Sequence, residues 1–125
     1  MAIRECQTED YNELKIMQLC RKIAANIQKG DYISLARDNA LCRVSEQDIR
    51  RVLGEYGGSV TMIPEEAFYN SNAFHVIAYR DGSGYHVDLD LWIDGDMSDL
   101  TLQVEINVDE NHKICGYHIL DILVM

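Results

Sequence analysis

Three residues that could transfer protons alternate in one short segment: His86, Asp88 and Asp90. Alternate residues of a β-strand share a face, so an imidazole and two carboxylates would lie together there. Such a group could act as a general acid and base. However, the sequence offers neither a nucleophile nor a third group to orient the histidine. His118 in a later apolar segment is typical of a half-buried histidine whose polar atoms are satisfied. We therefore interpret the segment as the polar outer face of a sheet and expect no enzymatic activity.

A second group of residues has part of the spacing of a calcium-binding loop. Asp94, Asp96 and Ser98 alternate, and Glu105 stands where such a loop places its bidentate glutamate. The sixth position of the loop requires glycine, but Asp99 occupies it, and a strand pattern follows where a helix would be needed. We predict a hairpin turn with exposed carboxylates here, with no metal and no other cofactor.

The four cysteines, Cys6, Cys20, Cys42 and Cys115, are far apart in the sequence. None forms the close pair that structural zinc sites use. The N-terminus has no apolar run of signal-peptide length, and no later run is long enough to span a membrane. We therefore expect a cytoplasmic protein whose cysteines are free thiols.

Negative charge is concentrated in the last third of the chain. The net charge is −10, and residues 81–125 contain ten acidic residues but only one base, Lys113. Such a field repels nucleic acids and membrane surfaces and attracts basic partners. A need for solubility would produce the same bias, so charge alone does not decide between these explanations.

Trp92, the only tryptophan, stands among these acids. Strand alternation places it on the outer face with Asp88 and Asp90, near Asp99. A large aromatic ring among carboxylates is typical of a hot spot that binds a basic protein surface. The alternative is that the ring packs under a loop or against a dimer partner.

The N-terminal part of the chain has helical periodicity. Apolar residues spaced three and four apart predict helices over about residues 8–29, 32–36 and 45–56. The third helix has a clear start, because Ser45 and Asp48 have the spacing of a capping box.

After Gly57 the period changes to two, which is typical of strands with one buried face. Glycine and aspartate turns separate the segments, and an irregular pattern in the last one predicts a β-bulge. The predicted strands cover residues 59–63, 74–79, 85–93, 98–108 and 113–124.

These patterns predict an α+β fold. Strands joined by tight turns form an antiparallel meander, and helices gathered at one end of the sequence cover one face of the sheet. We expect N-terminal helices packed on a curved antiparallel sheet of four to five strands. At 125 residues the chain fits a single domain over 1–125, with a helical part (1–57) and a sheet part (58–125).

The segment from Asp88 to Leu102, DLDLWIDGDMSDLTL, resembles a group of small bacterial proteins. In that group a DLW strand is followed by an acidic turn and an SDLTL strand. Residues 29–32 and 45–58 are similar to their helical half, so the resemblance covers about residues 20–125, with a shorter turn here. The order of elements also resembles the cystatin-like cone of the nuclear-transport-factor-two superfamily, which includes enzymes, binding proteins and dimerisation modules.

Small acidic chains of this kind also resemble the immunity proteins of contact-dependent growth inhibition systems. This resemblance implies a toxin inhibitor whose partner is a cognate toxin with a basic surface, commonly a nuclease, with neither nucleic acid nor membrane as a partner. A cone-fold protein with a small-molecule pocket between helices and sheet, using His86 or His118, remains the alternative, and a homodimer is left open. The predicted partner-binding residues are Asp88, Asp90, Trp92, Asp94, Asp96, Asp99 and Glu105.

Overall fold

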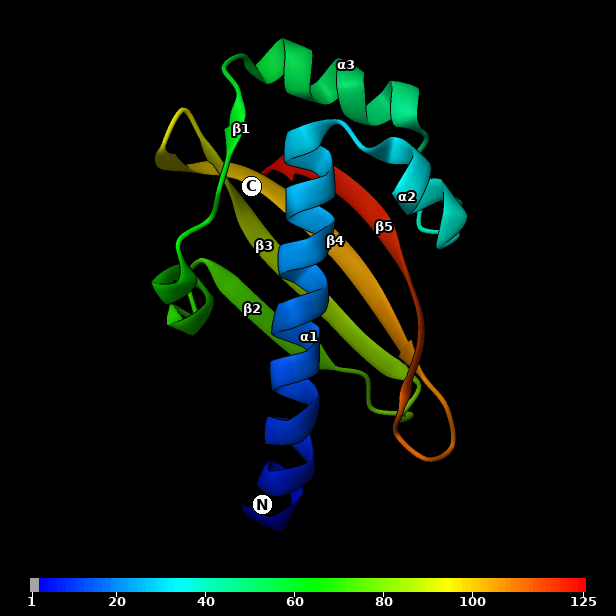
Figure 1. Ribbon diagram of the computed structural model, residues 1–125. Helices are drawn as coiled ribbons and strands as arrows, with labels where there is room; N and C mark the ends of the chain where they lie inside the picture. Colours follow the sequence, from blue (N-terminus) through cyan, green and yellow to red (C-terminus); the bar gives the residue numbers. More distant parts are fainter. Residues whose placement is uncertain (1–2) are drawn as a thin grey trace.

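The computed structural model describes the backbone of residues 3–125 and the side chains from Asn12 onward. It confirms the α+β fold, with helices followed by a five-stranded antiparallel sheet (Figure 1). The helices are α1 (Ile3–Lys29), α2 (Tyr32–Arg37) and α3 (Glu46–Tyr56), with a 3-10 helix η1 (Glu65–Tyr69) between the first two strands. The strands are β1 (Val60–Thr61), β2 (Phe74–Ala78), β3 (Gly84–Ile93), β4 (Asp96–Val108) and β5 (Ile114–Val124).

The sheet is open and its strands follow the predicted meander. β4 lies between β3 and β5. On the other edge of β3, β2 pairs with residues 85–89 and β1 pairs with residues 92–93. The pairing of β4 with β5 shifts twice, between Gln103 and Val104 and between Asn107 and Val108. These shifts confirm the bulge expected in the last strand.

Helix α1 lies across one face of the sheet, and α3 lies over one end of it (Figure 1). The predicted stripe of α1, which includes Ile16, Ile23 and Ile27, is buried. It packs in one core with the inward residues of β3 and β4, such as Leu89 and Leu102. Within residues 3–125 no helix combines the length and the apolarity needed to cross a membrane.

The segment that differs most from prediction lies between β1 and β2. The expected strand over 59–63 is reduced to the two residues of β1, and η1 follows Pro64. Proline has no N–H to donate to a strand ladder. Its fixed φ, here −63°, is compatible with the N-cap position that Pro64 occupies in front of η1. Helix α1 also begins earlier than expected, at Ile3.

The capping box of α3 is present. The Asp48 N–H donates to Ser45 Oγ at 3.1 Å, and the Ser45 N–H donates to Asp48 Oδ2 at 3.2 Å. We expect Ser45→Ala to lower the free energy of unfolding by about 1 kcal/mol, because it leaves an N-terminal N–H without its side-chain acceptor. Urea unfolding followed by circular dichroism measures the loss. Ser45→Asp is the control, since aspartate keeps the acceptor, and an equal loss in both variants would contradict the capping role.

The three cysteines with described side chains are free thiols, as predicted, and Cys6 lies outside the described side chains. Cys42 and Cys115 are exposed, whereas Cys20 is buried, and burial raises its pKa to about 12. A maleimide should therefore modify Cys42 and Cys115 in the folded protein and reach Cys20 only after unfolding. Peptide mapping by mass spectrometry reads this out, and fast native modification of Cys20 would contradict the packing of α1.

Candidate functional site

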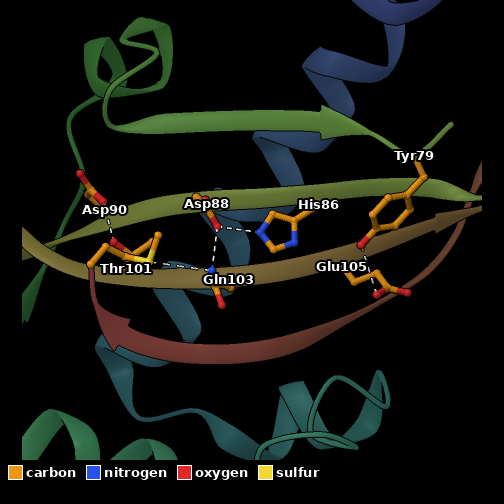
Figure 2. Close-up of polar contacts among 8 residues, drawn as sticks. Tyr79, His86, Asp88, Asp90, Thr101, Gln103 and Glu105 are labelled. Carbon is orange, nitrogen blue, oxygen red and sulfur yellow. Dashed lines mark hydrogen bonds and ion pairs between the residues drawn. The ribbon is translucent and has the colours of Figure 1, made fainter.

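Four carboxylates project from β3 and β4 on the side of the sheet opposite α1. They are Asp88, Asp90, Asp99 and Glu105, and we call them the acidic sheet face. In Figure 2 three of them are labelled on strands that have α1 behind them. Strand alternation explains their placement, because the alternate residues Leu89, Leu100, Leu102 and Val104 of the same strands are buried in the core.

The strand register gathers three of these carboxylates around one hollow. Asp88 lies opposite His75 of β2 and Gln103 of β4, and Asp90 lies opposite Thr101. The hollow has a volume of about 410 Å³ and is open to solvent. Its lining includes Asp88, Asp90, Asp99, Thr101, Ile77 and Met125.

Neutral donors and one histidine hold the carboxylates in place (Figure 2). Asp88 Oδ1 lies 2.8 Å from His86 Nε2 and accepts a hydrogen bond from Gln103 Nε2 at 3.2 Å. Thr101 Oγ1 donates to Asp90 Oδ1 at 2.9 Å. From α3, the hydroxyl of Tyr56 donates to Asp99 Oδ1 at 2.7 Å. These contacts orient the carboxylates without bringing a lysine or arginine to them.

The arginine and lysine ion pairs described within residues 16–125 lie elsewhere. Lys22 pairs with Asp38 beside α2, and Arg50 and Arg51 pair with carboxylates of α3. In the two ion pairs described on the sheet, the partner of the carboxylate is a histidine: His86 with Asp88, and His118 with Glu105. No lysine or arginine pair described within residues 16–125 therefore neutralises the acidic sheet face.

Glu105 belongs to a separate group further along the sheet. It accepts hydrogen bonds from the Tyr79 hydroxyl at 3.3 Å and from Asn107 Nδ2 at 3.2 Å. His118 Nε2 lies 3.8 Å from Glu105 Oε2. Burial and the charge of Glu105 raise the pKa of Tyr79, so this hydroxyl stays protonated and continues to donate. Glu105 does not line the hollow.

The other predicted contact residues lie outside the hollow. Trp92 is half-buried and packs against the hydrophobic core, after an irregularity in the β3–β4 register that follows Asp90. Its indole N–H is buried and has no partner within the described part of the chain. Asp94 and Asp96 lie at the predicted hairpin between β3 and β4, where Asp94 Oδ1 accepts the Ser59 N–H at 3.0 Å. Residues 12–125 contain no cluster of histidine, cysteine or carboxylate side chains that could hold a metal ion.

Comparison with known proteins assigns a family. The model of a family described as a domain of unknown function, DUF7668, matches residues 24–125. The chain belongs to the DUF7668 family. No curated protein and no solved structure matches it.

Several residues of this DUF7668 site were not singled out from the sequence. His75, Ile77 and Met125 line the hollow, but they come from the edge strand and from the end of the chain. Ile77 and Met125 are 48% and 66% exposed, so they offer apolar surface beside the carboxylates. Alternation along β2 is a sequence signal that could have found His75 and Ile77, whereas no such pattern points to Met125.

The carboxylates of the DUF7668 hollow repel one another. Burial raises the pKa of Asp90, and the charges of Asp88 and Asp99 raise it further against the opposing effect of the Thr101 hydrogen bond. A raised pKa means that the folded protein binds a proton more readily than the unfolded chain does. The contribution of Asp90 to stability is therefore fully present below the ordinary aspartate pKa and is lost as the pH rises through the raised value.

Asp90→Asn should consequently stabilise the protein at neutral pH. We expect a gain of roughly 0.5 kcal/mol in the free energy of unfolding, the scale of interactions between partly exposed charges. The gain should disappear below the ordinary aspartate pKa, where Asp90 is protonated in both states. Urea unfolding at several pH values measures it. A loss of stability in Asp90→Asn at neutral pH would show that the Thr101 contact outweighs the repulsion.

Proposed function

We propose that this DUF7668 protein is an immunity protein that binds a cognate bacterial toxin and blocks it. In this proposal the toxin is a nuclease, and the complex forms in the cytoplasm. The observation that supports it most strongly is the grouping of Asp88, Asp90 and Asp99 around one open hollow, with no lysine or arginine ion pair described for them.

The physical basis is electrostatic and steric occlusion. A nuclease surface is basic because it binds phosphates, so fixed carboxylates can occupy the places of those phosphates. Complementary charge also speeds association, which an inhibitor of a toxic enzyme needs. Ile77 and Met125 beside the carboxylates would add apolar contact area at the same surface.

A second candidate function is small-molecule binding or catalysis through a histidine. The observation in its favour is the 2.8 Å contact between His86 Nε2 and Asp88 Oδ1, the kind of contact that orients a general base. His86 and His118 both lie on the outer face, paired across from Glu105. Such a site would therefore use this face, and not the apolar layer between helices and sheet. A plain dimerisation module is the third candidate.

Genetic context and co-expression test these candidates. We expect the gene to follow one for a large secreted protein with a C-terminal toxin domain. Expression of that domain alone should arrest growth, and co-expression of the chain should restore growth and yield a stable complex. A metabolic operon with turnover of a small molecule would contradict the proposal in favour of the second candidate. Failure to protect together with a stable homodimer would contradict it in favour of the third.

A further inference from the structure

The edge of β2 that faces away from β3 has backbone hydrogen-bonding groups with no partner among the described residues. The Asp90 N–H donates to the Ala73 carbonyl, and the Tyr79 N–H donates to the Gly84 carbonyl, each at 2.9 Å. Backbone groups of an antiparallel strand point to alternate sides, so these bonds fix which residues face β3. The N–H and C=O groups of Val76 and Ala78 must point away from β3, and no other strand of the described chain pairs with β2.

An apolar groove runs along the inner side of this edge. It has a volume of about 360 Å³ and lies between β2, η1 and α1. Met17 of α1, Phe68 and Tyr69 of η1, and Phe74 and Val76 of β2 line it. The arrangement of an edge strand beside a helix, with a groove between them, is one that receives an added strand.

The acidic hollow lies on the outer side of the same edge. His75 and Ser71 line both the groove and the hollow, so the two cavities flank one length of the chain. A strand added to β2 would lie about 10 Å from β3, two strand spacings away. The long side chains of lysine and arginine can cross β2 from there and approach Asp88 and Asp90.

We propose that the β2 edge binds an extended segment of a basic protein partner as an additional strand. Side chains of that segment alternate, with apolar ones in the groove and lysine or arginine on the side of the hollow. Backbone pairing supplies the hydrogen bonds of Val76 and Ala78. The inference rests on the proposed function only for the basic character of the partner.

The charge of the protein argues against a second copy as the occupant. Pairing of β2 with β2 would place two acidic sheet faces side by side, in molecules that each carry a net charge of −10. The opposite sheet edge is less open, because the Ile119 N–H of β5 already donates to the Ala40 carbonyl and β5 contains both register shifts.

The test uses the full ¹⁵N-labelled chain and a nine-residue peptide that alternates valine and lysine. Binding should slow hydrogen exchange of the Val76 and Ala78 amides at least about tenfold. A peptide of the same composition with its lysines grouped at one end should not do so. Val76→Pro removes the edge N–H without touching the β3 ladder and should abolish this binding, whereas the matched control Val76→Thr keeps the N–H and should bind.

Each outcome of these measurements supports or contradicts the addition of a strand at β2. No binding of the alternating peptide at millimolar concentration, or equal binding by Val76→Pro and Val76→Thr, would overturn the proposal. If Val76→Pro does not fold, alternating peptides N-methylated at the pairing positions give the same answer with the wild-type chain. If Asp88→Asn with Asp90→Asn abolishes binding and Val76→Pro does not, the peptide binds the acidic sheet face and strand addition is overturned. Protection of Val76 that rises with protein concentration alone would identify a second copy and overturn the basic occupant.

Discussion

Replacing Asp88 and Asp90 together by asparagine should weaken binding to the proposed toxin partner by roughly 2–5 kcal/mol if both carboxylates are desolvated against cationic groups, and by much less if they lie at the rim. Asparagine keeps the shape of each side chain but removes the charge that the partner would meet. Exposed carboxylates should affect mainly the association rate, with strong salt dependence, while a desolvated one should also affect dissociation. Surface plasmon resonance at several salt concentrations separates the two rate constants.

The control for this experiment is Glu66→Gln with Glu110→Gln. Both residues are exposed, and the pair loses the same charge away from the hollow. It should therefore reproduce the effect of net charge on steering and nothing more. Tight binding by the Asp88 and Asp90 double variant at every salt concentration would show that the binding surface lies elsewhere, most simply on the helices. Trp92→Ala is a poorer probe, because that ring packs against the core and its loss would also affect folding.

Gly84→Ala should lower the free energy of unfolding by about 3 kcal/mol or more. Gly84 is buried at the start of β3, and a Cβ added there would lie 1.9 Å from the backbone carbonyl oxygen of Ile106. Because the clash is with backbone, it can be relieved only by moving β3 away from β4. Urea unfolding followed by circular dichroism measures the loss.

Two other glycines provide matched controls. Gly82 has a φ of +77° but an open space around a Cβ, so alanine there should cost only about 1 kcal/mol. Gly54 lies inside α3 with open space and no positive φ, so alanine there should stabilise the protein by about 0.5–1 kcal/mol. Similar losses in Gly84→Ala and Gly82→Ala would show that backbone conformation, and not the clash, sets the cost.

The sequence by itself determined most of the elements and the face on which the regularly alternating strand residues lie. Periodicity depends on neighbouring residues only, so the buried stripe of α1 and the outward positions of Asp88 and Asp90 could be predicted. The capping box of Ser45 and Asp48 is also local, since both partners lie within one helical turn. The concentration of charge in residues 81–125 needed no structure at all.

Only the tertiary structure decided which carboxylates share a site. The pairing of Asp90 with Thr101 sets which outward residues of β3 and β4 are neighbours, and that register depends on the irregularity after Asp90, which the sequence pattern does not reveal. Met125 reaches the hollow at the end of β5, where its N–H donates to the Asp99 carbonyl at 3.1 Å, and Glu105 lies outside the hollow. Strand alternation could not reveal that Trp92 packs against the core, because a register irregularity follows Asp90 and burial depends on residues distant in sequence.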